Sequence, residues 1–225
     1  MIPLRDRNPS GVFPTITVAL ILVNVIVFLY EASLGPAVTE FLKHYALIPA
    51  EVSGSLRYSE VGVRETVTPF FTSMFLHGGW LHLITNMWFL WIFGDNVEDT
   101  LGAIRYLLFY FLCGLGAAFT HFILQPQSTL PVLGASGAIA GVLGAYAVLF
   151  PGARVLTLVP IFFFIQFMEL PAVVILGYWF LLQILSGAVE GVSPMKGGTA
   201  WWAHIGGFLM GMALILVMRP RKVAV

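Results

Sequence analysis

Charge is scarce in this chain of 225 residues. Only 10% of the residues are charged, whereas a soluble domain carries about 25%, and 59% are hydrophobic. The 11 basic and 11 acidic side chains cancel to a formal net charge of zero and form no basic run, which speaks against a nucleic-acid partner. The single cysteine, Cys113, excludes an intramolecular disulfide. These shortages indicate a polytopic membrane protein.

Long apolar runs divide the chain into six predicted membrane spans. The first has about the 20 residues needed to cross a bilayer and exceeds the core of a cleavable signal peptide, so we expect it to stay in the mature protein. Asp95, Glu98 and Asp99 mark the expected exit of the second span. The predicted fold class is an all-α polytopic membrane protein, a six-helix bundle forming one membrane domain over residues 1–225 with a long first external loop. The spans are expected at about residues 13–34, 75–94, 104–125, 136–150, 171–187 and 200–218.

Two connecting segments carry signals of their own. In the long polar loop after the first span, residues 38–47 have apolar positions spaced like a short helix lying on the membrane interface. Residues 155–169 are apolar and aromatic, but Pro160 interrupts them and Pro171 follows. We expect this second segment to be an interfacial piece that leads into the fifth span.

The distribution of basic residues predicts the orientation. Six spans put both termini on one side, and short loops rich in lysine and arginine face the cytoplasm. We therefore expect a multi-pass protein of the cell (plasma or inner) membrane with both termini in the cytoplasm. The basic residues expected on the side of the termini are Arg5, Arg7, Arg105, Arg154, Arg219, Arg221 and Lys222, against Lys43, Arg57, Arg64 and Lys196 on the other.

Ser136 stands at the start of an apolar helix rich in small residues. A helix start presents unpaired N–H groups, which suits a nucleophile whose reaction builds an oxyanion, and it equally suits a serine N-cap. Residues 136–150 would cover only about 22 Å of a hydrocarbon core of about 30 Å. We therefore expect Ser136 below the external surface beside a watery cavity, unless the helix begins earlier, near Leu130.

His204 lies near the external end of the sixth span, as Ser136 does in the fourth. An ionisable side chain within a span is a functional hypothesis by default. Two small-xxx-small glycine pairs would let these two helices approach closely and bring the serine and the histidine within hydrogen-bonding reach. The pairs are Gly137 with Gly141, and Gly207 with Gly211.

No carboxylate occurs at that depth, so the sequence predicts a Ser–His dyad rather than a triad. His82 and Asn86 are four residues apart, hence on one face of the second span, at a similar depth. They are candidates for binding an oxyanion. The alternative is that they only hold the second span to a neighbouring helix.

Three motifs together resemble the signatures of the rhomboid intramembrane serine proteases. They are HGGWLHLITN from His77 to Asn86, GASG from Gly134 to Gly137, and AHIGGFLMG from Ala203 to Gly211, in the family's order. The resemblance extends over essentially the whole chain.

The resemblance implies a function for each part of the site. Ser136 would be the nucleophile, His204 the general base and acid, and His82 and Asn86 would help the Ser136 amide to bind the oxyanion. The fifth span would be a lateral gate for a substrate helix. Some members carry an aromatic residue one turn after the nucleophile to support the histidine. Here that position is Ala140, so the support of His204 must come from elsewhere.

The expected function is an intramembrane serine endopeptidase that cleaves transmembrane-segment peptide bonds of single-span membrane proteins. Its expected partners are these substrates and the lipid bilayer, with no nucleic acid, no cofactor and no metal, and a monomer should suffice for catalysis. One alternative is a non-catalytic protein of the same fold that binds membrane clients. Another is a solute channel or carrier, which the lack of a continuous charged path across the membrane disfavours.

Overall fold

The computed structural model describes residues 1–58, 62–161, 164–192 and 199–219, so Lys196, Arg221 and Lys222 of the orientation argument lie outside it. The described part is mostly helical. Four of its helices are long and apolar enough to cross a membrane, and they match the first, third, fifth and sixth predicted spans. They are α1 (Thr15–Ser33), α6 (Ala103–Leu124), α8 (Ala172–Val192) and α9 (Trp201–Met218).

The other two predicted spans are helices with a different character. α7 (Ser136–Leu149) is apolar but has only 14 residues, or about 21 Å. α5 (Trp80–Leu101) begins later than expected and runs past the predicted exit to Gly102, whose positive φ of 76° separates it from α6. The three acidic residues expected to mark the exit of the second span therefore lie within the last two turns of α5, and their place as the membrane exit stays a prediction.

Glu98 explains why α5 continues through its acidic end. Its side chain is buried, and its two carboxylate oxygens accept hydrogen bonds from the N–H groups of Ile16 (2.9 Å) and Thr17 (2.8 Å). Those donors belong to the first turn of α1, where intrahelical acceptors are missing. The carboxylate thus caps α1 and fixes it to α5.

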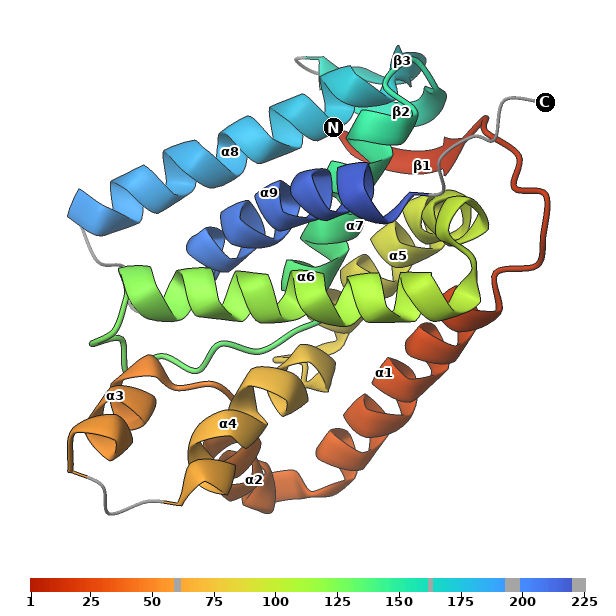
Figure 1. Ribbon diagram of the computed structural model, residues 1–225. Coiled ribbons are helices and arrows are strands. Elements are labelled where there is room, and N and C mark those ends of the chain that lie inside the picture. The colour runs from red at the N-terminus through yellow and green to blue at the C-terminus, as the bar shows by residue number, and fades with distance from the viewer. Residues whose placement is uncertain (59–61, 162–163, 193–198, 220–225) are drawn as a thin grey trace.

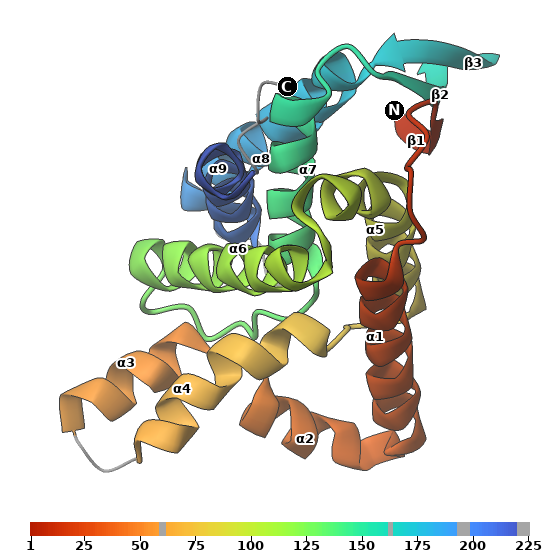
Figure 2. The same ribbon diagram turned by 45° about the vertical axis from the view of Figure 1, so that its right-hand side comes forward.

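The loop between the first and second spans folds into short helices. They are η1 (Gly35–Ala37), α2 (Val38–Tyr45), α3 (Pro49–Tyr58), α4 (Val63–Thr72) and η2 (Ser73–Phe75). Figures 1 and 2 show α2, α3 and α4 gathered at one end of the bundle. The short helix expected within residues 38–47 is confirmed as α2.

A small antiparallel sheet lies at the opposite end, so the all-α prediction is incomplete (Figures 1 and 2). Its strands, in the order β1–β2–β3, are β1 (Ile2–Asp6), β2 (Arg154–Ile161) and β3 (Phe164–Pro171). The segment expected to be an interfacial piece is the hairpin of β2 and β3. Along β2, Val155, Thr157 and Val159 are buried in alternation with more exposed neighbours, which is the period of a strand and not of a helix.

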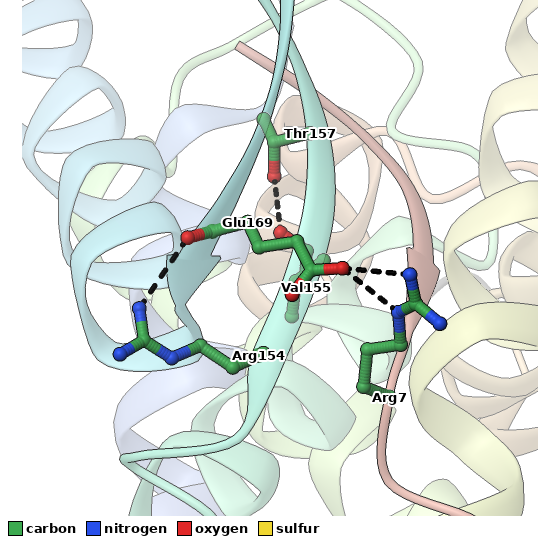
Figure 3. Close-up of polar contacts among 5 residues, drawn as sticks. All are labelled: Arg7, Arg154, Val155, Thr157 and Glu169. Carbon is green, nitrogen blue, oxygen red and sulfur yellow. Dashed lines mark hydrogen bonds and ion pairs between the residues drawn. The ribbon is translucent and has the colours of Figure 1, made fainter.

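Side chains join the ends of this sheet. The guanidinium of Arg7, the residue after β1, pairs with the Glu169 carboxylate on β3 at 2.7 Å, and Arg154 of β2 donates to the Glu169 carbonyl oxygen (Figure 3). Both partners of the ion pair are about half exposed, and exposed pairs contribute only about 0–1 kcal/mol. The backbone ladder therefore defines the sheet more than this pair does.

The helices α7 and α9 pack closely against each other near the centre of the bundle. α7 packs against α5, α6, α8 and α9. A Cβ added to Gly207 would overlap the carbonyl of Gly137, and one added to Gly211 would overlap the carbonyl of Gly141. The predicted close approach of the two glycine faces is confirmed, because only hydrogen atoms separate the two backbones at these positions.

Candidate active site

Ser136 is the first residue of α7, and its side chain faces α9. The helix begins at Ser136 and not near Leu130, with Ala135 in the N-cap position. The Ser136 side chain does not cap the helix. Its Oγ lies 2.8 Å from Nε2 of His204, which confirms the predicted contact between the two side chains.

His204 is held at its other ring nitrogen by a residue that the sequence interpretation missed. Nδ1 of His204 lies 2.7 Å from Oε1 of Gln183, a buried side chain on α8. The indole of Trp179, one turn earlier on α8, lies beside the imidazole at a centroid distance of 5.7 Å. The support that Ala140 cannot give therefore comes from α8. The sequence feature that could have identified Gln183 is that it is an amide side chain within a mostly apolar span.

Gly134 shapes the approach to the serine. Its φ of 119° is a conformation that residues with a side chain rarely adopt, and an added Cβ would lie 2.8 Å from the His82 ring and 3.5 Å from Asn86 Nδ2. The backbone before Ser136 therefore passes directly over His82 and Asn86 on α5. The structure brings both side chains to the site, as expected from their spacing.

Asn86 holds an unused hydrogen-bond donor. Its Nδ2 is buried and has no acceptor among the described residues. A buried polar group without a partner is costly, and such groups in a native protein call for an explanation. In the His82 ring, by contrast, one nitrogen already has a partner, because Nδ1 accepts a hydrogen bond from the Gly78 N–H at 3.4 Å.

His77 belongs to the surroundings of the site. Its backbone N–H donates to the buried Glu31 carboxylate at 3.2 Å, and its ring meets the His82 ring edge to face at 5.2 Å. It thus links α1 to the start of α5. These contacts give His77 a structural role beside the site.

A cavity of about 880 Å³ opens beside these groups. Its wall includes Ser136, His204, His82 and Asn86. Ser73, Thr85 and Thr199 add hydroxyl groups to the lining. The volume is large enough for a segment of extended polypeptide together with water. Chemically, the wall offers a hydroxyl, a base bonded to it, and free N–H donors.

The family of this chain is shown by its similarity to known proteins. The family model described as "Rhomboid domain" matches residues 64–221, which is more than half of the chain. The chain belongs to the rhomboid family. The matched range includes α5, α7, α8 and α9, and therefore every residue of the site described above.

Individual rhomboid proteins are similar over different extents. RHOMBOID-like protein 6, mitochondrial, of Arabidopsis thaliana is 27% identical over 93% of this chain and 69% of its own length. Rhomboid protein 1, mitochondrial, of Saccharomyces cerevisiae is 31% identical over 86% of this chain. Rhomboid protease GluP of Bacillus subtilis is 42% identical, but over 33% of this chain and 14% of its own length. The chain spans about half of the yeast protein.

Proposed function

We propose that this rhomboid protein is an intramembrane serine endopeptidase acting on single-span membrane proteins. The observation that carries the proposal is the 2.8 Å contact between Ser136 Oγ and His204 Nε2 in the wall of a cavity. A serine hydroxyl is a weak nucleophile until a base takes its proton, and a neutral imidazole is suited to that task. The name of the Bacillus relative, a rhomboid protease, supports the same reaction class.

The reaction follows from these positions. Ser136 Oγ attacks the substrate carbonyl carbon while its proton passes to His204 Nε2. His204 then gives that proton to the leaving amine, and an acyl-enzyme remains on Ser136. Water entering through the cavity loses a proton to His204 and attacks the ester. The bond to Ser136 Oγ then breaks, the second product leaves, and His204 returns the proton to Oγ.

The oxyanion would bind at the start of α7. The N–H groups of Ser136 and Gly137 lie in the first helical turn, where intrahelical acceptors are missing. Asn86 Nδ2 offers a further donor without a partner, and the His82 ring lies beside it. Removal of one such donor costs about 10²–10³ in rate, so we expect Asn86→Ala to slow catalysis by about that factor.

The proposal includes six membrane crossings, with α5 and α7 as the second and fourth, a long external first loop and both termini in the cytoplasm. A membrane-impermeant thiol reagent tests it on Pro9→Cys and Thr39→Cys, both exposed, while the buried Cys113 gives little background. The reagent should reach Pro9→Cys from the cytoplasmic side alone and Thr39→Cys from the other. We also propose that the protein resides in the cell membrane. Two relatives carry mitochondrial names, so fractionation of cells that express a tagged chain would show whether it is found in the cell membrane or in mitochondria.

The substrate must present an extended backbone to Ser136. In a stable helix the carbonyl groups are engaged in backbone hydrogen bonds, and breaking these bonds is costly in lipid. We therefore propose substrates with small residues at the cleaved bond and a segment weakened by glycine or proline. α8, which borders the site through Trp179 and Gln183, would be the gate through which this segment enters.

A fluorophosphonate probe and a panel of single-span substrates test the proposed function. The parent protein should be labelled and should cleave a substrate, Ser136→Ala should do neither, and His204→Ala should be labelled far more slowly. Ser73→Ala is the matched control, because Ser73 lines the same cavity without contacting His204. Equal labelling of Ser136→Ala would refute the proposal. Stable substrate capture without cleavage by the parent would instead favour a client-binding protein.

A further inference from the structure

The amide of Gln183 has only one orientation that satisfies both of its contacts. One end of the amide lies 3.2 Å from the backbone carbonyl oxygen of Trp179, and the other lies 2.7 Å from His204 Nδ1. A carbonyl oxygen can only accept a hydrogen bond, so the end that faces Trp179 must be the NH₂ group. The oxygen Oε1 is therefore the atom directed at the imidazole.

This orientation determines the tautomer of His204. Oε1 has no hydrogen to donate, so the ring can bond to it only with a proton on Nδ1. In the neutral ring, Nε2 then carries a lone pair, and this is the atom that faces Ser136 Oγ. The opposite tautomer would set Oε1 against an unprotonated nitrogen and would present an N–H to the serine hydroxyl.

We propose that Gln183 is a positioning residue that holds His204 in the tautomer able to accept the proton of Ser136. The proposal rests on the proposed function, in which His204 is the base. A carboxylate performs this orienting role in soluble serine proteases and also stabilises the imidazolium that forms. The amide orients the ring without adding a charge, which suits a buried position between membrane helices.

The proposal makes the position of α8 part of the catalytic arrangement. α8 packs on α9 and α7 at the edge of the bundle (Figure 1), and side chains such as Val173, Leu181 and Leu185 are exposed on its outer side. Ser136 and His204 come from α7 and α9, whereas the group that orients them comes from α8. Displacement of α8 by a few ångströms would remove the orienting bond and leave the Ser136–His204 contact without it.

Nitrogen-15 NMR of histidine-labelled protein in micelles tests the tautomer directly. The His204 signals are assigned by their loss in His204→Ala. In the parent protein we expect a protonated Nδ1 and an unprotonated Nε2. A parent protein with the proton on Nε2 would overturn the proposal, whatever any variant does.

The variants then test the role of the amide. Gln183→Met keeps the side-chain length but removes the acceptor, so we expect loss of the single tautomer and an about 10- to 100-fold lower maximal rate of fluorophosphonate labelling. The apparent affinity for the probe should not change. Gln183→Glu, which retains an acceptor oxygen, should restore the Nδ1-protonated form. Gln166→Met repeats the substitution at an exposed glutamine of β3 and should behave like the parent.

The two proposals fail in different ways. If Ser136→Ala is labelled as fast as the parent, the proposed peptidase activity is wrong. If only Ser136 is labelled but Gln183→Met leaves both the labelling rate and the tautomer unchanged, the peptidase proposal stands and the role of Gln183 is refuted. A Gln183→Met protein that keeps its thermal stability and loses the tautomer separates orientation from folding.

Discussion

Replacement of Gly207 by alanine is expected to push α9 away from α7. The added Cβ would overlap the carbonyl oxygen of Gly137 and would lie 3.0 Å from its carbonyl carbon and 3.3 Å from Ala117 Cβ. Backbone atoms cannot move aside by changing rotamer. Because comfortable contacts between carbon atoms need about 3.5–4.0 Å, the two helices must separate by about 1 Å.

The size of the effect follows from that separation. Overfilling a tight contact costs about 1–3 kcal/mol, and alanine regains about 1 kcal/mol of helix propensity over glycine, so we expect a destabilisation of up to about 2 kcal/mol. The catalytic effect should be larger. The Ser136–His204 contact is 2.8 Å, and about 1 Å more takes it beyond hydrogen-bond range. Loss of the general base costs about 10²–10⁴ in rate.

Thermal unfolding in micelles and the rate of fluorophosphonate labelling measure the two effects. Gly177→Ala is the matched control, because Gly177 lies in α8 and nothing stands within 4 Å of an added Cβ. This control should be as stable as the parent or slightly more stable, and it should be labelled at the parent rate. A Gly207→Ala protein with parental stability and labelling would refute the idea that backbone contact between α7 and α9 sets the serine–histidine distance.

Two further predictions concern the end of the molecule that carries the sheet. Glu98→Gln should lower the free energy of unfolding by about 1–3 kcal/mol, since one of the two N–H groups of Ile16 and Thr17 would face an NH₂ group; the melting temperature in micelles checks this. Burial raises the pKa of Asp6, although the hydrogen bond from Tyr146 opposes the shift, so the folded protein holds the Asp6 proton more tightly than the unfolded chain does. The stabilisation from the Asp6 proton should be complete at low pH and lost as the pH rises through the raised pKa. A plot of melting temperature against pH should therefore fall over this range in the parent protein and should be flatter in Asp6→Asn.

Most of the correct predictions came from the length of the apolar runs and from the spacing of the glycines. Apolar runs of sufficient length located α1, α6, α8 and α9, because few structures other than a helix can span a bilayer. The glycine pairs predicted the contact between Ser136 and His204, because close backbone approach depends on the absence of a side chain and therefore shows in the sequence. The spacing of four residues likewise predicted that His82 and Asn86 lie on one face of α5.

Pairing between distant segments could not be predicted in the same way. β2 and β3 form a hairpin, but the third strand, β1, comes from the other end of the sequence, and no local pattern specifies that pairing. The capping role of Glu98 near the end of α5 could not be predicted, for a related reason. A carboxylate near a predicted membrane exit resembles a solvated charge until a partner is known, and the partner of Glu98 is the start of α1.

Gln183 shows how the membrane setting changes the expected chemistry. The prediction of a dyad rested on the absence of a carboxylate at the depth of His204, and that reasoning holds for groups that stabilise by charge. Orientation of a neutral imidazole needs only an acceptor oxygen, which an amide supplies at a lower cost of burial. The site is correspondingly built from neutral groups, Ser136, His204, Gln183 and Asn86, whereas the Arg7–Glu169 ion pair belongs to the sheet at the far end. If the proposed reaction takes place here, stabilisation of its oxyanion must come from fixed N–H dipoles, whose strength depends on the exclusion of water and on the helix positions. In the proposed peptidase, the packing of α7, α8 and α9 would for that reason matter to catalysis as much as the side chains themselves.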